Sequence, residues 1–270
     1  MCAQANNGTL LDRILESRRA EVQLRKRVLP ETALKYGVEA ASPLRDFPGA
    51  LTRPGINVMA ELKPASPSRG VLREPFDPVA LAQSLEATGA VALSVLTEPE
   101  FFRGSLKNLR DARKSANLPV LRKDFIFDPW QVWEARANDA DSFLLIVLTL
   151  SDARLKELLA LGRELGMEPL VEVHTREELD RALAAEARII GVNNRNLKTL
   201  EVRTDTSFEL VDHIPENCVA ISESGIRTHR ELTRLRAAGF DAFLIGTCLM
   251  LSPDPATALA ELLGPRAKGK

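Results

Sequence analysis

The sequence predicts an α/β protein whose parallel strands close into one barrel with helices outside. Eight short runs rich in Val, Ile and Leu follow one another from residue 56 onward. Stretches with helical spacing and charges on one side separate these runs, which is the alternation of a parallel α/β fold. The runs are continuously apolar, as expected for strands buried on both faces. Because a (β/α)8 TIM barrel requires eight strands, we predict that fold, preceded by an N-terminal helical extension.

The predicted strands are bounded by turns that contain glycine, proline or polar residues. Each run has the length of an ordinary strand and none is long enough to be a separate hydrophobic helix. In chain order they are INVMAE (56–61), VALSVL (91–96), LPVLRK (118–123), SFLLIV (142–147), EPLVEV (168–173), ARIIGV (187–192), CVAIS (218–222) and FDAFLIG (240–246).

The predicted helices between the strands begin at polar caps and lead into glycine-bearing turns. An Asp-Pro pair opens the first of them, because proline is favoured in the first turn of a helix. Thr228 and Glu231 have the spacing of a capping box in a later one. The clearest segments are DPVALAQSLEATGA (77–90), SDARLKELLALGRELG (151–166), THRELTRLRAAGF (228–240) and DPATALAELLG (254–264), the eighth helix.

The residues before the first strand carry apolar positions and prolines of their own. The opening segment has the pattern of an amphipathic helix with Asp12, Arg13, Glu16 and Arg18 facing water. We expect this extension to lie on one end of the barrel and not to form a separate domain. The expected division is one domain over 1–270, with an extension over about 1–50 and the barrel over 56–265.

Charge and hydropathy exclude several classes of function. Lys and Arg (36) nearly balance Asp and Glu (37), so the chain offers no strong field for nucleic acid or an anionic membrane. The longest apolar runs, such as FLLIVLTL (143–150), are far shorter than the roughly 20 residues that cross a bilayer. The N-terminus lacks a signal-peptide pattern. We therefore expect a cytoplasmic protein.

Neither the cysteines nor the histidines form a pattern typical of a metal site. The three cysteines are widely spaced without a CxxC pair, and the three histidines are scattered. We expect buried free thiols and surface or loop histidines, and we predict no metal and no cofactor. The residues concerned are Cys2, Cys218, Cys248, His174, His213 and His229.

Charged and amide side chains recur where the predicted strands end. In a parallel barrel the active site lies at the carboxyl ends of the strands, because the loops there surround one mouth. Lysines and glutamates that converge on one cavity shift each other's pKa values, as acid and base catalysts require. The candidates are Glu61 and Lys63 after the first strand, Lys123 and Asp124 after the third, Glu172 after the fifth, Asn193, Asn194 and Arg195 after the sixth, and Glu223 and Ser224 after the seventh.

A purely structural role stays open for each charge taken alone. Glu61 and Lys63 lie on the same side of a strand and could form an ion pair that stabilises the rim of the barrel. Lys123 could pair with Asp124 or with a neighbouring glutamate. The repetition of charges at one pole of the barrel favours catalysis.

Turns rich in serine and glycine indicate a phosphate site. Backbone amides at such turns bind phosphate without a large net charge, and phosphate sites after strands seven and eight are frequent in this fold. Each glycine taken alone could merely permit a tight turn. The candidates are Ser66, Ser68 and Gly70 after the first strand, Ser224 and Gly225 after the seventh, and Gly246 and Thr247 after the eighth.

Phenylalanines follow the second and third predicted strands, in a chain with only 5% aromatic residues. Phe101, Phe102 and Phe125 are therefore expected at the mouth of the barrel. They either pack the rim or hold an aromatic substrate ring.

Seven motifs together resemble the indole-3-glycerol phosphate synthase family of tryptophan biosynthesis. They run in family order from about residue 56 to 250, and the leading LDRILESRRAEV is similar to the family's opening helix. The chain departs from the family pattern at Thr247, where serine is frequent, and at Asp139, where glycine is usual. The motifs are AELKPASPSRG, SVLTEPEFFRGS, VLRKDFIFDPWQVWEAR, EPLVEVHT, IIGVNNRNLKTLEV, AISESGI and FLIGTCLM.

The resemblance implies closure of the pyrrole ring of 1-(2-carboxyphenylamino)-1-deoxyribulose 5-phosphate, with loss of carbon dioxide and water. It also implies functional proximity to other enzymes of the tryptophan pathway. By similarity, Lys123 is the general acid with Glu61 and Lys63 beside it, Glu172 is the base, Asn193 and Arg195 position the substrate, and Glu223 lies near the sugar hydroxyls. Lys63 with Phe102, Phe125 and Leu144 holds the carboxylated ring, and Ser66, Ser224, Gly225, Gly246 and Thr247 bind the phosphate.

Three other functions stay open from the residues themselves. Phosphoribosylanthranilate isomerase is another phosphate-binding barrel with a related substrate. A Schiff-base aldolase would use a lysine at a strand end to attack a carbonyl group. A catalytically silent barrel would bind its phosphorylated ligand unchanged. Two lysines with three glutamates suit ring closure better than an acid and base pair that opens a sugar ring.

Overall fold

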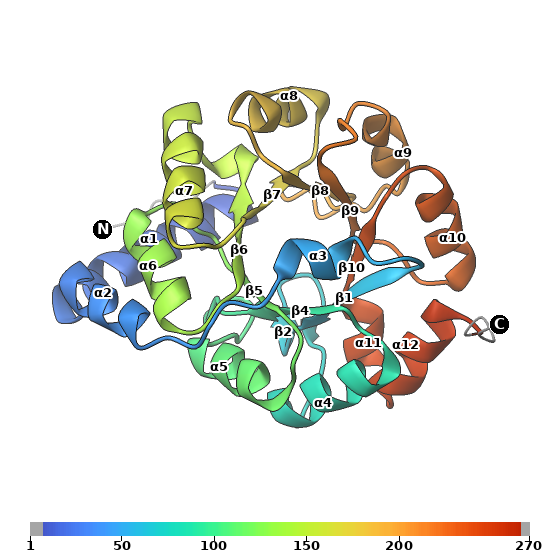
Figure 1. Ribbon diagram of the computed structural model, residues 1–270, viewed down its shortest axis with the longest axis horizontal. Helices are drawn as coiled ribbons and strands as arrows, with labels where there is room; N and C mark the ends of the chain where they lie inside the picture. The colour runs from blue at the N-terminus through green and yellow to red at the C-terminus, as the bar shows by residue number, and fades with distance from the viewer. Residues whose placement is uncertain (1–7, 266–270) are drawn as a thin grey trace, which may run out of the picture.

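The computed structural model describes residues 8–265 and shows a closed barrel of parallel strands surrounded by helices (Figure 1). The strand order β1-β10-β9-β8-β7-β6-β5-β4 closes because β1 also pairs with β4. The predicted TIM barrel is therefore confirmed, and each predicted strand lies within two residues of its observed ends. The barrel strands are β1 (Asn57–Leu62), β4 (Ala92–Leu96), β5 (Val120–Lys123), β6 (Ser142–Ile146), β7 (Leu170–Val173), β8 (Ile189–Asn193), β9 (Val219–Glu223) and β10 (Ala242–Ile245).

The helices cover the outside of the barrel and start at the predicted caps. The Asp77 side chain accepts hydrogen bonds from two backbone amides of the first turn of its helix, and Thr228 and Glu231 form the expected capping box. The helices after the first strand are α4 (Pro78–Thr88), α5 (Leu106–Ser115), α6 (Pro129–Ala137), α7 (Asp152–Glu164), α8 (Arg176–Ala184), α9 (Asp205–Val211), α10 (His229–Ala237), α11 (Thr247–Leu251) and α12 (Pro255–Leu263).

Two smaller elements complete the loops at the carboxyl ends of the strands. In the loop that follows β1, β2 (Ala65–Ser66) pairs antiparallel with β3 (Gly70–Val71). A short 3-10 helix, η1 (Val147–Thr149), follows β6. The serine-rich loop after the first strand is thus a hairpin whose backbone hydrogen bonds limit its conformations.

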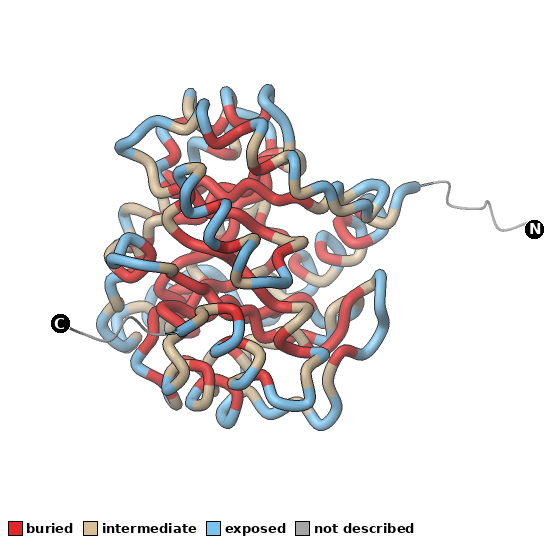
Figure 2. The backbone as a smooth tube through the Cα atoms, turned by 90° about the vertical axis from the view of Figure 1, so that its right-hand side faces the viewer, coloured by how far each residue is buried: buried red, intermediate tan, exposed pale blue. Residues whose placement is uncertain are grey.

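The barrel core consists of two layers of apolar side chains. One layer fills the space between strands and helices, and the other fills the barrel interior. Buried backbone runs through the centre of the molecule, while exposed residues lie on its periphery (Figure 2). Side chains alternate along a strand, so every second residue faces the interior. In β5, for example, Leu121 belongs to the interior cluster, whereas the Arg122 guanidinium bonds to α6. Lys123 therefore points inward again.

The N-terminal extension reaches both ends of the barrel, which corrects the expectation that it lies on one. Its first helix, α1 (Leu10–Val28), places Leu11 and Ile14 at the mouth formed by the carboxyl ends of the strands. The second, α2 (Glu31–Glu39), packs on α6. The third, α3 (Phe47–Leu51), contacts β1 and β4 and covers the opposite end of the barrel (Figure 1).

Arg18 also differs from its predicted exposure. It lies on α1 with only 1% of its surface exposed, and its guanidinium donates to Asp124 at 2.8 Å. A helical pattern places a residue on a face but does not reveal a buried carboxylate beneath it. This ion pair fastens α1 to the strand that carries Lys123.

Two further predictions concern cysteines and membrane spans. Cys218 and Cys248 are free but only partly buried, and Cys2 lies outside the described residues. Within residues 8–265, no helix combines the length and apolarity that a membrane span requires.

Candidate active site

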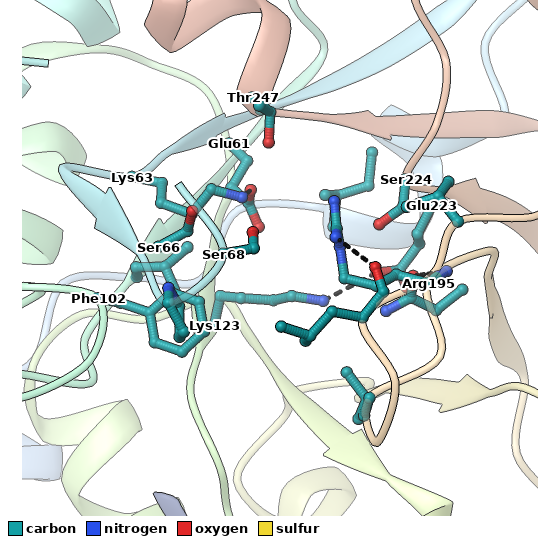
Figure 3. A pocket seen from close by; sticks show the side chains of 18 of the residues that line it. Glu61, Lys63, Ser66, Ser68, Phe102, Lys123, Arg195, Glu223, Ser224 and Thr247 are labelled. Atoms are coloured by element: carbon teal, nitrogen blue, oxygen red, sulfur yellow. Dashed lines mark hydrogen bonds and ion pairs between the residues drawn. The ribbon is translucent and has the colours of Figure 1, made fainter. Parts of the chain in front are cut away.

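A cavity of about 390 Å³ opens at the carboxyl ends of the strands. All fifteen side chains proposed from the sequence as site residues line it. Figure 3 shows Lys123 extending across this cavity from the side of Phe102 toward Glu223. Their convergence follows from the barrel, because inward-facing positions at the ends of different strands share one mouth. They are Glu61, Lys63, Ser66, Phe102, Lys123, Phe125, Leu144, Glu172, Asn193, Arg195, Glu223, Ser224, Gly225, Gly246 and Thr247.

Lys123 lies at the centre of the charged groups. Its Nζ is 2.8 Å from Glu172 Oε2 and 2.8 Å from Glu223 Oε2, and its side chain is 13% exposed. Burial opposes protonation of the amine, but the two carboxylates outweigh it and hold the pKa of Lys123 above its usual value. Lys123 is therefore an ammonium ion at neutral pH. It pairs with these two glutamates and not with Asp124, which bonds to Arg18 and Arg122.

The two glutamates around Lys123 have opposite pKa shifts. Burial raises the pKa of Glu223 to about 7, with Lys123 opposing and Glu172 adding to the shift. Burial opposes ionisation of Glu172 as well, but Lys123 and His174 outweigh it and hold its pKa well below the usual range. Two carboxyl groups with separated pKa values can serve different roles, one as a constant anion and one as a proton carrier.

Glu61 and Lys63 form an ion pair on the same side of β1. The side chains are 6% and 13% exposed, so the pair is largely removed from water. Gly246 of the β10 end permits this arrangement, because a Cβ there would collide with the Glu61 carboxylate. The pair is thus both a structural contact, as one reading of the sequence allowed, and part of the cavity wall.

Three apolar side chains form part of the cavity wall. The rings of Phe102 and Phe125 are tilted, with centroids 6.3 Å apart, and Leu144 of β6 belongs to the same interior cluster. Phe101 packs against the same interior cluster and against the guanidinium of Arg13 at 5.9 Å, outside the cavity lining, which is the rim packing that the sequence left open. The wall can contact a flat ring, since two aromatic faces and an aliphatic group share one side of the cavity.

The end of the cavity near β9 and β10 is made of backbone-rich turns. Ser224 and Gly225 both have positive φ, 66° and 85°, a conformation that bends the chain sharply at the end of β9. Gly246 and Thr247 lie at the start of α11, and Ser66 of β2 lines the same cavity. Hydroxyls and backbone amides gathered in this way suit an anion such as phosphate.

Several lining residues were not predicted as site residues. Leu10, Leu11 and Ile14 of α1 form part of the cavity wall, as does Arg227 after β9. The apolar face of the opening helix was visible in the sequence, but the surface that it would cover was not. Asn194, by contrast, was a candidate whose side chain is buried and bonds to Ser222, to the carbonyl oxygens of Glu223 and Ser224, and to Ser207.

His174 lies in the loop between β7 and α8, so its expected loop position is confirmed, but its place beside the site was not predicted. Its side chain is only 9% exposed and lies between two carboxylates. It follows the site residue Glu172 by two positions, so it lies on the same side of the chain. This two-residue spacing was the one feature of the sequence that could have indicated a position beside Glu172.

Comparisons with known proteins give a consistent result. The family model described as indole-3-glycerol phosphate synthase matches residues 11–262. A protein of that name from Mycobacterium sp. (strain KMS) is 48% identical over 258 residues, covering 96% of this chain and 95% of the relative. Another, from Laribacter hongkongensis (strain HLHK9), is 46% identical, covering 94% of this chain and 98% of the relative.

Solved structures with a similar barrel share little sequence with this chain. The structure of 3-hexulose-6-phosphate synthase from Salmonella typhimurium has a TM-score of 0.63 at 12% identity, covering 77% of this chain and 97% of the other. A likeness at this identity concerns the fold alone.

Proposed function

The chain belongs to the indole-3-glycerol phosphate synthase family, and we propose that the cavity around Lys123 performs the reaction of that family. The enzyme is a carboxy-lyase of tryptophan biosynthesis. It converts 1-(2-carboxyphenylamino)-1-deoxyribulose 5-phosphate into indole-3-glycerol phosphate, carbon dioxide and water. The observation that carries the assignment is the position of the Lys123 ammonium, 2.8 Å from each of two carboxylates beside an apolar wall.

Ring closure requires a cation at the ketone oxygen of the substrate. The ring carbon that bears the carboxylate attacks the ketone carbon, and negative charge develops on the oxygen. Lys123 is ionised and reaches into the cavity, so it is the group that would donate a proton or hydrogen bond to this oxygen. Carbon dioxide then leaves as the aromatic ring is restored.

Loss of water requires an acid and a base on the same intermediate. The Glu172 carboxylate is held ionised and is 1% exposed, which suits a base that removes a proton from carbon. An ammonium, from Lys63 or Lys123, would protonate the departing hydroxyl group. Asn193 of β8 faces the same cavity and would hold the substrate between them.

The remaining cavity residues would bind the two ends of the substrate. We assign the carboxylated ring to Lys63 and the wall of Phe102, Phe125 and Leu144, since these supply one cation and a flat apolar surface. We assign the phosphate to the turns at the ends of β9 and β10 together with Ser66 and Arg195. Glu223 would accept hydrogen bonds from the sugar hydroxyls, which lie between the two ends.

A location in the cytoplasm and functional proximity to other enzymes of the tryptophan pathway are also part of the proposal. A doubly charged sugar phosphate does not cross a bilayer unaided, so the enzyme must share a compartment with the reaction that supplies it. Free thiols at Cys218 and Cys248 are consistent with a reducing compartment.

The test is to mix the protein with the carboxyphenylamino deoxyribulose phosphate and follow fluorescence at indole wavelengths. The intact protein should produce the signal, and Lys123→Ala should lower turnover about 10²- to 10⁴-fold, the usual worth of acid catalysis. Lys107→Ala is the matched control, because Lys107 is 76% exposed and outside the cavity. An absent signal from the intact protein would overturn the function, and normal turnover by Lys123→Ala would overturn the role of Lys123.

A further inference from the structure

A buried histidine lies directly behind the catalytic carboxylate. His174 follows β7, and its ring lies between Glu172 at the end of that strand and Glu178 in the first turn of α8. Its Nδ1 is 3.0 Å from Glu178 Oε2, and its Nε2 is 3.4 Å from Glu172 Oε1. The backbone amide of His174 also donates to Glu178 Oε2 at 2.8 Å. The ring is therefore fixed from both sides.

The contacts of the two ring nitrogens determine the protonation state of His174. Each nitrogen faces a carboxylate oxygen, and an ionised carboxylate only accepts hydrogen bonds. A neutral imidazole would turn a lone pair toward one of the two carboxylates. An imidazolium donates a hydrogen bond from Nδ1 to Glu178 and holds its second N–H at ion-pair distance, 3.4 Å, from Glu172. Burial lowers the pKa of His174, but Glu172 and Glu178 outweigh it and raise the pKa to about 9.

A second group that can carry positive charge lies beside the carboxyl pair around Lys123. Lys123 is shared between Glu172 and Glu223, so one ammonium faces two buried carboxyl groups. His174 contacts Glu172 alone of this pair, and its charge lowers the proton affinity of Glu172 selectively. On its other side His174 borders a second cavity whose charged and titratable groups are Arg176, Glu201, Arg203, Glu209 and His213.

We propose that His174 is a positioning residue: as an imidazolium held by Glu178, it keeps Glu172 ionised and aimed at Lys123, so that a proton taken up by the carboxyl pair at low pH goes to Glu223 and not to Glu172. This inference rests on the proposed function, because it explains how Glu172 is kept as a base. His174 is not among the residues that line the cavity around Lys123. Its contribution is to divide the roles between two glutamates that would otherwise compete for the same proton.

The protonation state can be measured without substrate. A pH titration of the intact protein, followed by NMR of 15N-labelled imidazole rings, should show three histidine signals, since the chain contains three histidines. One of them should titrate near 9 with both nitrogens protonated at neutral pH, and it should vanish in His174→Gln. His213→Asn and His229→Asn assign the other two. A His174 signal that titrates near the ordinary value of about 6.5 would overturn the proposal.

A second experiment measures the enzyme kinetics of His174→Gln, a variant that keeps a side-chain hydrogen-bond donor but removes the charge. The carboxyl pair should then hold its proton more tightly, and the acid limb of the kcat/KM profile should move to higher pH by about 1 unit. Glu178→Gln should shift the same limb in the same direction by less. His213→Asn should leave it in place, because His213 borders only the second cavity.

The outcomes separate this inference from the proposed function. An intact protein without turnover would refute the function, while the ring titration would still decide the charge on His174. Turnover that falls equally at every pH in His174→Gln, with the acid limb unmoved, would show a merely structural role and refute the inference. If His174→Gln does not fold, the proposal is tested by the pH profile of Glu178→Gln and by the NMR titration of the intact protein.

Discussion

Glu223 shows how a single buried carboxyl group acquires a property that its residue type does not have. It is 1% exposed at the end of β9, with Lys123 on one side and Glu172 close by. Gly191 on the neighbouring strand makes room for it, because a Cβ there would collide with the Glu223 carboxyl group. Burial and the nearby anion raise its pKa to about 7, within the range where an enzyme works.

The pH dependence of the reaction should reflect this residue. If ionised Glu223 accepts hydrogen bonds from the sugar hydroxyls, kcat/KM should be low below its pKa and rise as pH increases through about 7. Glu223→Gln keeps an acceptor but cannot titrate. Its kcat/KM should be lower and nearly constant across the neutral range. Steady-state kinetics of both proteins over a pH series provide the measurement, and an unchanged acid limb in Glu223→Gln would assign that limb to another group.

At the scale of elements, α1 is held to the barrel by a buried network of charges. Arg18 bonds to Asp124, which also accepts hydrogen bonds from Thr97 and Arg122. Arg122 in turn reaches Glu134 of α6. The network connects an N-terminal helix to the strand that carries Lys123, and the same helix lines the cavity through Leu11 and Ile14. The position of α1 should therefore affect both stability and substrate binding.

Arg18→Met tests this connection. The variant keeps a long apolar stem but removes one charged partner of Asp124, and we expect a loss of about 1.5–3 kcal/mol in the free energy of unfolding. Arg122 and Thr97 remain, so Asp124 is not left unpaired. Looser docking of α1 should raise KM more than it lowers kcat. The exposed Arg27 is on the same helix, and Arg27→Met should change neither quantity. An Arg18→Met protein with unaltered KM would separate α1 from substrate binding.

At the scale of the whole molecule, the two ends of the barrel have different tasks. The mouth gathers charged groups, whereas α3 closes the opposite end with Phe47 and Leu51, which are 1% and 0% exposed. Both ends contact the same interior cluster. Since the extension covers both ends, we propose that it folds with the barrel as one domain.

Phe47→Ala and Phe102→Ala should separate these tasks. Removing the buried Phe47 ring should cost about 3–5 kcal/mol of unfolding free energy, measured by chemical denaturation, with kcat preserved at low temperature. Phe102 is partly exposed in the cavity, so Phe102→Ala should chiefly raise KM and cost less stability. Equal effects of the two variants on KM would contradict the assignment of substrate binding to the mouth and of stability to the opposite end of the barrel.

The sequence by itself determined the fold and most of the cavity. Eight apolar runs, the caps at Asp77 and Thr228, and charges at the strand ends depend on local chemistry and on a two-residue period, both of which can be followed along a chain. Closure of the barrel then brings the ends of all strands to one mouth. For this reason the fifteen proposed residues line one cavity, including Leu144, which only the family resemblance had named.

Only the tertiary structure decided which groups touch. It paired Lys123 with Glu172 and Glu223 and not with Asp124, buried the Arg18 side chain that was expected to face water, and enclosed His174 between two carboxylates. These contacts join residues that are far apart in the chain or lie on different elements. Their energies depend on burial and on charges within a few ångströms, quantities that no local pattern records.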